Sequence, residues 1–152
     1  MNFKNKKVVV VGGSAGMGLS IAKEAYKKGA KIIIGGRTLP KLENAAKEIG
    51  ENVEFETINT MDESSVKSFF EKVEAIDYLV IPGSSVKTSN FKELSLPDAM
   101  FTMNNKFFGQ YLCAKYANIN DGGSITLFSG ILSRRPGQND SILGPVNAAV
   151  EA

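Results

Sequence analysis

A glycine-rich segment after the first aliphatic run has the clearest chemistry in the sequence. It reads VGGSAGMG over residues 11–18 and joins an expected strand to an expected helix. Glycine lacks a Cβ, so the backbone can turn tightly and approach a phosphate, which the free N–H groups of the helix start then attract. We expect a dinucleotide's diphosphate here; a mere tight turn is the alternative. The candidate residues are Gly12, Ser14, Ala15, Gly16, Met17 and Gly18.

The end of the second aliphatic run indicates which dinucleotide is preferred. In dinucleotide-binding folds an acidic side chain here binds the ribose diol, whereas an arginine accepts a 2′-phosphate. This sequence has no carboxylate at that point and reads GGRT over residues 35–38. Arg37 and the hydroxyl of Thr38 therefore predict that NADP(H) is preferred over NAD(H), by roughly tenfold to a hundredfold for Arg37. A solvated arginine at a strand end is the alternative.

The glycine spacing Gly-x-x-x-Gly-x-Gly, formed by Gly12, Gly16 and Gly18, resembles the cofactor fingerprint of the short-chain dehydrogenases/reductases. The resemblance covers nearly the whole chain and implies a Rossmann fold. It also implies cofactor contacts after the third and fourth strands, where the family's aspartate and Asn-Asn-Ala-Gly turn are replaced. The residues expected to make these contacts are Asn59, Thr60, Gly83 and Ser84.

The same resemblance implies a catalytic serine, tyrosine and lysine and a helical asparagine, and the chain departs from all four. Gly130 stands at the serine position, Leu143 at the tyrosine position and Asn147 at the lysine position, while Lys106 replaces the asparagine. The chain thus looks like a divergent family member without the Ser-Tyr-Lys set. A positioned general acid contributes about 10²–10⁴-fold to rate, so ordinary ketone reduction should be slow unless other groups act.

Two residues are candidates for such a substitute role. Lys106 is expected near the nicotinamide, where desolvation would lower its pKa; alternatively it satisfies backbone carbonyls. Ser129 lies one residue from the serine position and could bind a substrate oxygen. Tyr111 and Lys115 form a literal Tyr-x-x-x-Lys, but they precede the fifth strand, so we expect a packing or subunit-contact pair on one helix face.

Three functions remain open at this point. The first is an NADP(H)-binding oxidoreductase that transfers hydride to a small carbonyl substrate, or from an alcohol, with altered catalytic groups. The second is a catalytically inactive NADP(H) sensor or assembly subunit, and the third is an interaction domain without nucleotide. The sequence identifies no substrate, because the family's substrate-covering segment has no counterpart in it.

Composition excludes several other classes of protein. The chain has no histidine and one cysteine, so neither a Ser-His-Asp hydrolase nor a disulfide is possible, and we expect no metal site. A net charge of +2 argues against nucleic-acid binding. No apolar run approaches the ~20 residues that span a bilayer, and no signal peptide is apparent, so we expect a cytoplasmic protein without membrane attachment.

Strands and helices alternate along the sequence. Five β-branched runs are the expected strands, at residues 7–11, 31–34, 53–58, 78–81 and 124–128. The expected helices cover residues 18–28, 40–49, 63–73, 97–117 and a last one opening near residue 145. Thr38, Thr60 and Ser95 are the expected N-terminal caps. This pattern predicts one α/β domain over residues 1–152, a doubly wound parallel sheet in three layers with strand order 3-2-1-4-5.

The expected domain ends after its fifth strand and the start of the next helix, so we expect either a truncated form or a partner at the exposed edge. The resemblance implies a homo-oligomer through the fourth and fifth helices. Aromatic residues in the fourth helix could supply that interface or pack on the sheet: Phe101, Phe107, Phe108 and Tyr111.

Overall fold

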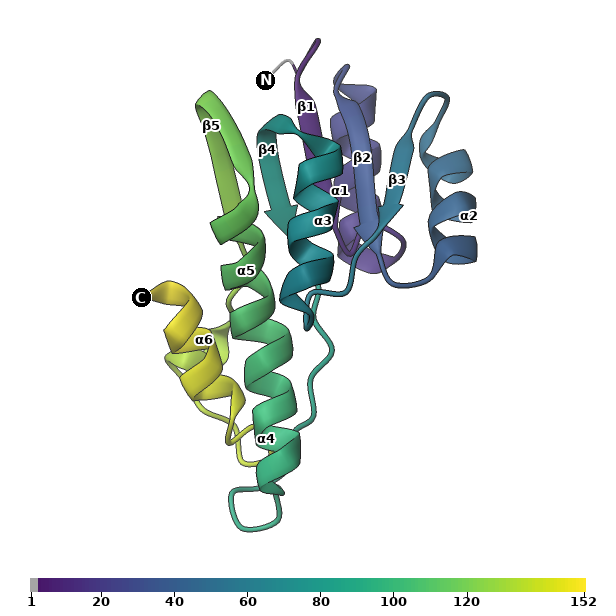
Figure 1. Cartoon of the computed structure of the whole chain (residues 1–152). Helices are drawn as coiled ribbons and strands as arrows, with labels where there is room; N and C mark the ends of the chain where they lie inside the picture. Colours follow the sequence, from purple (N-terminus) through teal and green to yellow (C-terminus); the bar gives the residue numbers. More distant parts are fainter. Residues whose placement is uncertain (1–2) are drawn as a thin grey trace.

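The computed structural model describes residues 3–152 and contains a five-stranded parallel sheet in the order β3-β2-β1-β4-β5 (Figure 1). The strands are β1 (Lys7–Val11), β2 (Lys31–Gly36), β3 (Glu54–Thr57), β4 (Ala75–Ile81) and β5 (Asn118–Leu127). The helices are α1 (Gly16–Lys27), α2 (Leu39–Ile49), α3 (Glu63–Val73), α4 (Leu96–Met103), α5 (Gly109–Tyr116) and α6 (Leu143–Glu151). The predicted fold class and strand order are confirmed.

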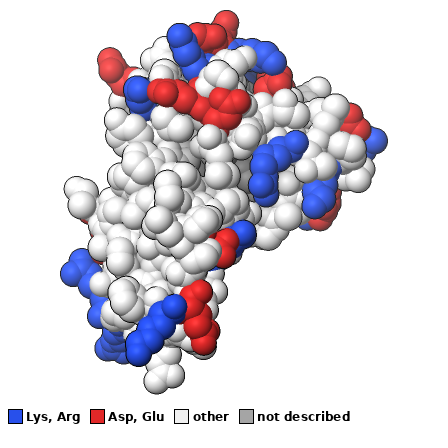
Figure 2. Space-filling model, turned by 60° about the horizontal axis from the view of Figure 1, so that its bottom comes forward, with Lys and Arg blue, Asp and Glu red and all other residues white. Residues whose placement is uncertain are grey.

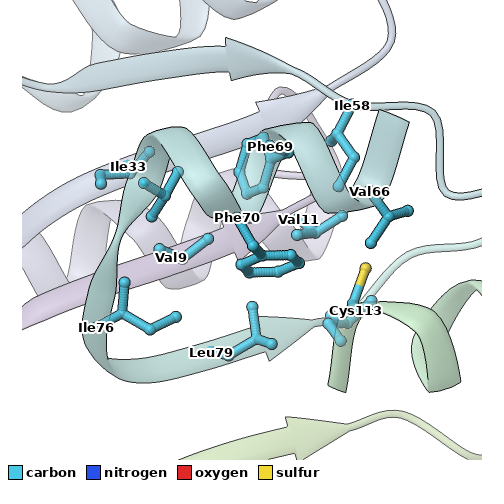
Figure 3. Packing of buried hydrophobic residues seen from close by; sticks show 12 residues of the cluster. Val9, Val11, Ile33, Ile58, Val66, Phe69, Phe70, Ile76, Leu79 and Cys113 are labelled. Atoms are coloured by element: carbon cyan, nitrogen blue, oxygen red, sulfur yellow. The ribbon is translucent and has the colours of Figure 1, made fainter. Parts of the chain in front are cut away.

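Alternate residues of the central strands point to opposite faces of the sheet and form two cores. On one face Val9 and Val11 pack beneath α3 and α5, and Figure 3 shows Phe69 and Phe70 of α3 lying over them. On the other face the neighbouring β1 residues pack against α1 and α2. Cys113 of α5 is fully buried in the first core, and this burial raises the pKa of its thiol to about 12.

The helix starts follow the predicted capping chemistry in part. The Ser95 hydroxyl accepts a hydrogen bond from the Asp98 backbone N–H and caps α4, as expected. The expected cap at Thr60 is wrong. Asp62 stands directly before α3, and its carboxylate accepts hydrogen bonds from the backbone N–H groups of Ser64 and Ser65. A carboxylate only accepts hydrogen bonds and favours the positive end of the helix dipole, so Asp62 is the better cap.

Strand β5 is longer than its sequence predicts. It begins at Asn118, although strand character was expected only from residue 124, and its register against β4 shifts between Ile76 and Tyr78. At this shift the carboxylate of Asp77 accepts hydrogen bonds from the Lys7 backbone N–H at 2.8 Å and from Lys6 Nζ at 3.0 Å. These bonds hold the pKa of Asp77 below its usual range, with the Lys7 contact as the largest cause. The pairing passes from Ile76 with Ile119 to Tyr78 with Ser124, so the Asn-Asp-Gly-Gly residues 120–123 form an insertion in it, and Gly122 has a positive φ of +78°, in keeping with the turn preference of this composition.

The long helix expected over residues 97–117 is present but not uniform. Between α4 and α5 the chain forms a π-helical segment, η1 (Asn104–Phe108), and a short 3₁₀ helix, η2 (Ile131–Ser133), follows β5. π-helical turns such as η1 are rare and often occur at functional sites. No helix within residues 3–152 is long and apolar enough to cross a membrane.

Candidate cofactor-binding site

The turn from β1 into α1 has the backbone geometry of a phosphate cradle. Gly12 and Gly16 have positive φ angles of +87° and +54°, which residues with a Cβ rarely adopt. A Cβ on Gly18 would collide with the Gly12 carbonyl oxygen, so only glycine allows this close packing. The N-cap residue Ala15 makes no side-chain capping bond to α1. The first N–H groups of the helix are therefore available to an anion such as a diphosphate.

A cavity of about 310 Å³ opens beside this turn, where β1, β2 and β4 end. It brings together seven of the residues predicted to bind the cofactor: Gly12, Ser14, Arg37, Thr38, Thr60, Gly83 and Ser84. The other lining residues are Val11, Gly36, Lys41, Ile58, Ser85 and Asn105. Figure 2 turns the lower end of Figure 1 forward and shows Lys and Arg side chains at the right, the side on which α2 lies in Figure 1, and others at the lower left.

Arg37 reaches across this cavity. Its Nη2 donates a hydrogen bond to the Ser85 hydroxyl at 3.4 Å, and the Ser85 backbone N–H donates to Oδ1 of Asn105 at 3.2 Å. Lys41, one helical turn after Arg37, adds a second cation that sequence reasoning missed. Lys41 stands four residues after Arg37, in the first turn of the expected second helix, and this spacing could have indicated that the two cations lie close together. Two cations and the Thr38 hydroxyl suit a phosphate monoester.

Five predicted cofactor residues do not line this cavity. Asn59 lies beside a neighbouring depression with Arg37, and its Oδ1 accepts a hydrogen bond from the Met61 backbone N–H. Met17 faces a second cavity. The remaining three form the turn and helix start beneath the cradle: Ala15, Gly16 and Gly18.

The second cavity, of about 250 Å³, shares Gly83 and Ser84 with the first. It brings together three of the residues predicted around the reaction site: Lys106, Ser129 and Leu143. Gly130 and Asn147 are absent from its lining. The two cavities therefore adjoin along the turn that follows β4.

Lys106 projects from η1 toward this second cavity. It is half-buried, and this desolvation lowers the pKa of its ammonium group, as expected. Within residues 3–152 no hydrogen bond or ion pair of Lys106 Nζ is formed, so the alternative in which it satisfies backbone carbonyls has no support. Lys106 is an unpaired proton donor that faces a cavity lined by both polar and apolar side chains.

Ser129 is tied to a carboxylate that sequence reasoning missed. Its hydroxyl donates to Oε1 of Glu151, which also accepts from the Ser133 hydroxyl at 2.6 Å, and Arg134 lies 3.3 Å from the other carboxylate oxygen. These contacts hold the pKa of Glu151 below its usual range, the Ser129 hydrogen bond being the largest cause. Glu151 lies one turn after Asn147 on α6, which was the only sequence signal for it.

Asn147 and Leu143, which were predicted to stand at the family's lysine and tyrosine positions, have structural roles here. Nδ2 of Asn147 donates to the Gly130 carbonyl at 3.3 Å, and this buried contact ties α6 to the segment after β5. Oδ1 of Asn147 has no hydrogen-bond partner within residues 3–152. Leu143 contributes only apolar surface to the cavity. Neither residue can supply a proton or a positive charge.

Tyr111 and Lys115 lie away from both cavities. Lys115 Nζ forms an ion pair with Glu63 of α3 at 2.8 Å. Tyr111 is half exposed, and its ring contacts those of Phe107 and Phe108. The Tyr-x-x-x-Lys motif that they form therefore contributes no side chain to either cavity.

Known proteins resemble the chain in sequence and in fold. It is 30% identical over 160 residues to a "PIGF/3-ketodihydrosphingosine reductase fusion protein" of Schizosaccharomyces pombe, covering 95% of the chain and 32% of that protein. It is 37% identical over 74 residues to an "NADP-dependent (R)-specific alcohol dehydrogenase" of Lentilactobacillus kefiri, covering 47% of the chain and 29% of that protein. A short chain dehydrogenase from Burkholderia cenocepacia in complex with NADP shares the fold, with a TM-score of 0.90 and 22% identity over 98% of the chain and 65% of that structure.

The chain thus spans less than two thirds of each of these proteins. A family model described as "short chain dehydrogenase" matches residues 6–139, which include the glycine cradle, Arg37 and the π-helical segment. This match covers most of the chain and agrees with the strand order and the site geometry. The chain belongs to the short-chain dehydrogenase/reductase family.

Proposed function

We propose that the chain binds NADP(H) and takes part in hydride transfer between its nicotinamide and a small carbonyl or alcohol substrate. The observation that carries this proposal is the arrangement of two adjoining cavities on either side of the uncapped start of α1. One contains the cations Arg37 and Lys41, and the other contains Lys106 and Ser129. NADP(H) has a diphosphate between its two nucleosides and a 2′-phosphate on its adenosine ribose. The start of α1 suits the diphosphate, and Arg37 with Lys41 suits the 2′-phosphate.

The chain's own residues would hold the cofactor in three places. Arg37, Lys41 and Thr38 would bind the 2′-phosphate, the N–H groups at the start of α1 would bind the diphosphate, and Gly83 with Ser84 would pass beneath a ribose. The names of two similar proteins, one "NADP-dependent" and one solved "in complex with NADP", support the preference for the phosphorylated form. When bound, the nicotinamide supplies or accepts a hydride ion.

Lys106 would do the acid–base work around the substrate oxygen, with Ser129 beside it in the same cavity. The Lys106 ammonium group donates a proton to the carbonyl oxygen as the carbonyl carbon is reduced, and it is reprotonated from water. The Ser129 hydroxyl lies in the same cavity and donates its proton to Glu151, so it would accept a hydrogen bond from the hydroxyl group of an alcohol substrate or product. This role for Lys106 needs its ammonium group to be unpaired, as it is.

A catalytically inactive sensor is the second candidate function. It is favoured by the replacement of the family's tyrosine and lysine by Leu143 and Asn147, because Asn147 is committed to the Gly130 carbonyl. Cofactor binding is common to both candidates. Turnover of a carbonyl substrate distinguishes them.

Titration calorimetry with NADPH and NADH tests the shared claim. We expect NADPH to bind roughly tenfold to a hundredfold more tightly than NADH, because only NADPH offers a 2′-phosphate to Arg37 and Lys41. Equal affinity for the two would remove the proposed phosphate site. Absence of heat with both, in a folded sample, would leave the third possibility, an interaction domain without nucleotide.

We further propose that two copies of the chain associate through the helical segment that runs from α4 through η1 to α5. Phe108 and Tyr111 expose 45% and 50% of their surface there, next to Phe107, and large exposed aromatic side chains are typical of interface centres. Sedimentation equilibrium should then give twice the 16.4 kDa mass of one copy. The Tyr111→Ser variant should shift this equilibrium toward the single copy. A monomer at every concentration would contradict the proposal.

A further inference from the structure

We propose that Gln110 is the positioning residue of the second cavity: its side-chain amide fixes the turn that carries Lys106 against the chain segment that carries Ser129. The proposal deepens the function proposed above and rests on it for its catalytic meaning. The geometry itself depends only on the described contacts of one buried side chain.

Gln110 lies in the first turn of α5 and is only 3% exposed. Its Nε2 donates to the Lys106 carbonyl at 2.8 Å and to the Phe128 carbonyl at 3.2 Å. Its Oε1 accepts a hydrogen bond from the Phe128 backbone N–H at 2.7 Å. Both amide protons and one acceptor site are therefore used, which is nearly the full capacity of a glutamine side chain.

These bonds continue the backbone hydrogen bonding of β5 by one residue. Phe128 directly follows Leu127, which is the last residue of β5 that pairs with β4. The Gln110 amide meets both the N–H and the C=O of Phe128, as the backbone of an adjacent strand would. Ser129 is the next residue, so the position of its hydroxyl follows from this anchor.

The other end of the bridge is the π-helical segment. Lys106 lies within η1, a type of turn that is rare and needs support from its surroundings. The Gln110 side chain adds a hydrogen bond to the Lys106 carbonyl one turn back along the helix. One amide thus sets the separation between the backbone of Lys106 and the backbone next to Ser129.

This separation governs how much water reaches Lys106. Lys106 is the only titratable residue that lines the cavity, whose other walls include Met17, Pro82 and Leu143. Glu151 adjoins the cavity through its hydrogen bond to Ser129. Loss of the amide bridge would let the π-helical turn and the end of β5 separate, and Lys106 would become hydrated.

The test is the pH dependence of Lys106 acetylation by trace acetic anhydride, followed by peptide mass spectrometry on the whole chain. Exposed Lys47 serves as the internal reference. In Gln110→Met we expect the midpoint for Lys106 to rise by about 0.5 pH unit, because hydration restores the charged form. The matched control Gln138→Met, in an exposed loop, should leave the midpoint unchanged. An unchanged midpoint in a folded Gln110→Met variant overturns the proposal.

A second measurement needs no variant and covers the case in which Gln110→Met does not fold. The Phe128 amide hydrogen should exchange with solvent at least about tenfold more slowly than that of Gln138, since it is bonded to a buried oxygen. Equal exchange would show that the bridge is absent. Cofactor titration separates the two proposals: if NADPH does not bind while the Lys106 midpoint shifts, the proposed function fails and the role of Gln110 in the cavity stands.

Discussion

Lys106→Met should lower the rate constant of carbonyl reduction by about 10²–10⁴-fold while leaving the affinity for NADPH almost unchanged. Methionine keeps most of the length and apolar surface of lysine but carries no proton. Among the described residues that line the cavity, Lys106 is the one cation, and Leu143 and Ser129 beside it carry no positive charge. The effect should therefore appear in kcat rather than in cofactor binding.

The measurement is the decay of NADPH absorbance with a panel of aldehydes and ketones, repeated across pH. Because the protonated amine is the active form, the rate should fall as pH rises through the pKa of Lys106. Desolvation places this fall below the pH at which an ordinary lysine loses its proton. Lys47→Met, on the exposed side of α2, is the matched control and should keep the full rate. A Lys106→Met variant within about twofold of the unmodified rate would refute the proton-donor role.

Arg37→Ala should weaken NADPH binding roughly tenfold to a hundredfold and NADH binding by less than about twofold. The guanidinium lies in the cavity beside Lys41, and within residues 3–152 it makes one long hydrogen bond, at 3.4 Å to Ser85, which a phosphate would readily replace. NADH has a hydroxyl in place of that phosphate. The ratio of the two dissociation constants is thus the quantity that should change.

Calorimetric titration of both nucleotides measures this ratio, and high salt should reduce it in the unmodified chain because the contact is between charges at the surface. Arg135→Ala is the matched control, since Arg135 is exposed and lines neither cavity. Similar losses of NADPH and NADH affinity in Arg37→Ala would mean that Arg37 supports the fold of the site rather than recognising the 2′-phosphate.

Much of the fold could be predicted because its signals are local. Strands β1 and β2 are continuous runs of valine and isoleucine, which need burial on both faces and therefore a parallel sheet between helices. The glycine cradle was equally readable, since Gly12 and Gly18 are required by a backbone angle and by a close contact. Arg37 lines the cavity beside this turn because the end of β2 fixes its position, and its contact with a 2′-phosphate stays a prediction.

The remaining features depend on contacts between distant segments. Gln110 and Phe128 are eighteen residues apart, and nothing in their spacing indicates that one would bond the backbone of the other. Asp77 likewise holds Lys7 across seventy residues, so the early start of β5 beside it had no local signature. The π-helical segment was read as ordinary α-helix because its composition is compatible with both.

The low reactivity of Cys113 makes the chain suitable for site-specific labelling at an introduced cysteine. As the sole cysteine it is fully buried, and with a pKa of about 12 it is almost entirely protonated at neutral pH. A thiol in that state reacts slowly with maleimides and oxidants, because the thiolate is the reactive form. A cysteine introduced at the mouth of either cavity could therefore carry a fluorophore without first removing the natural one.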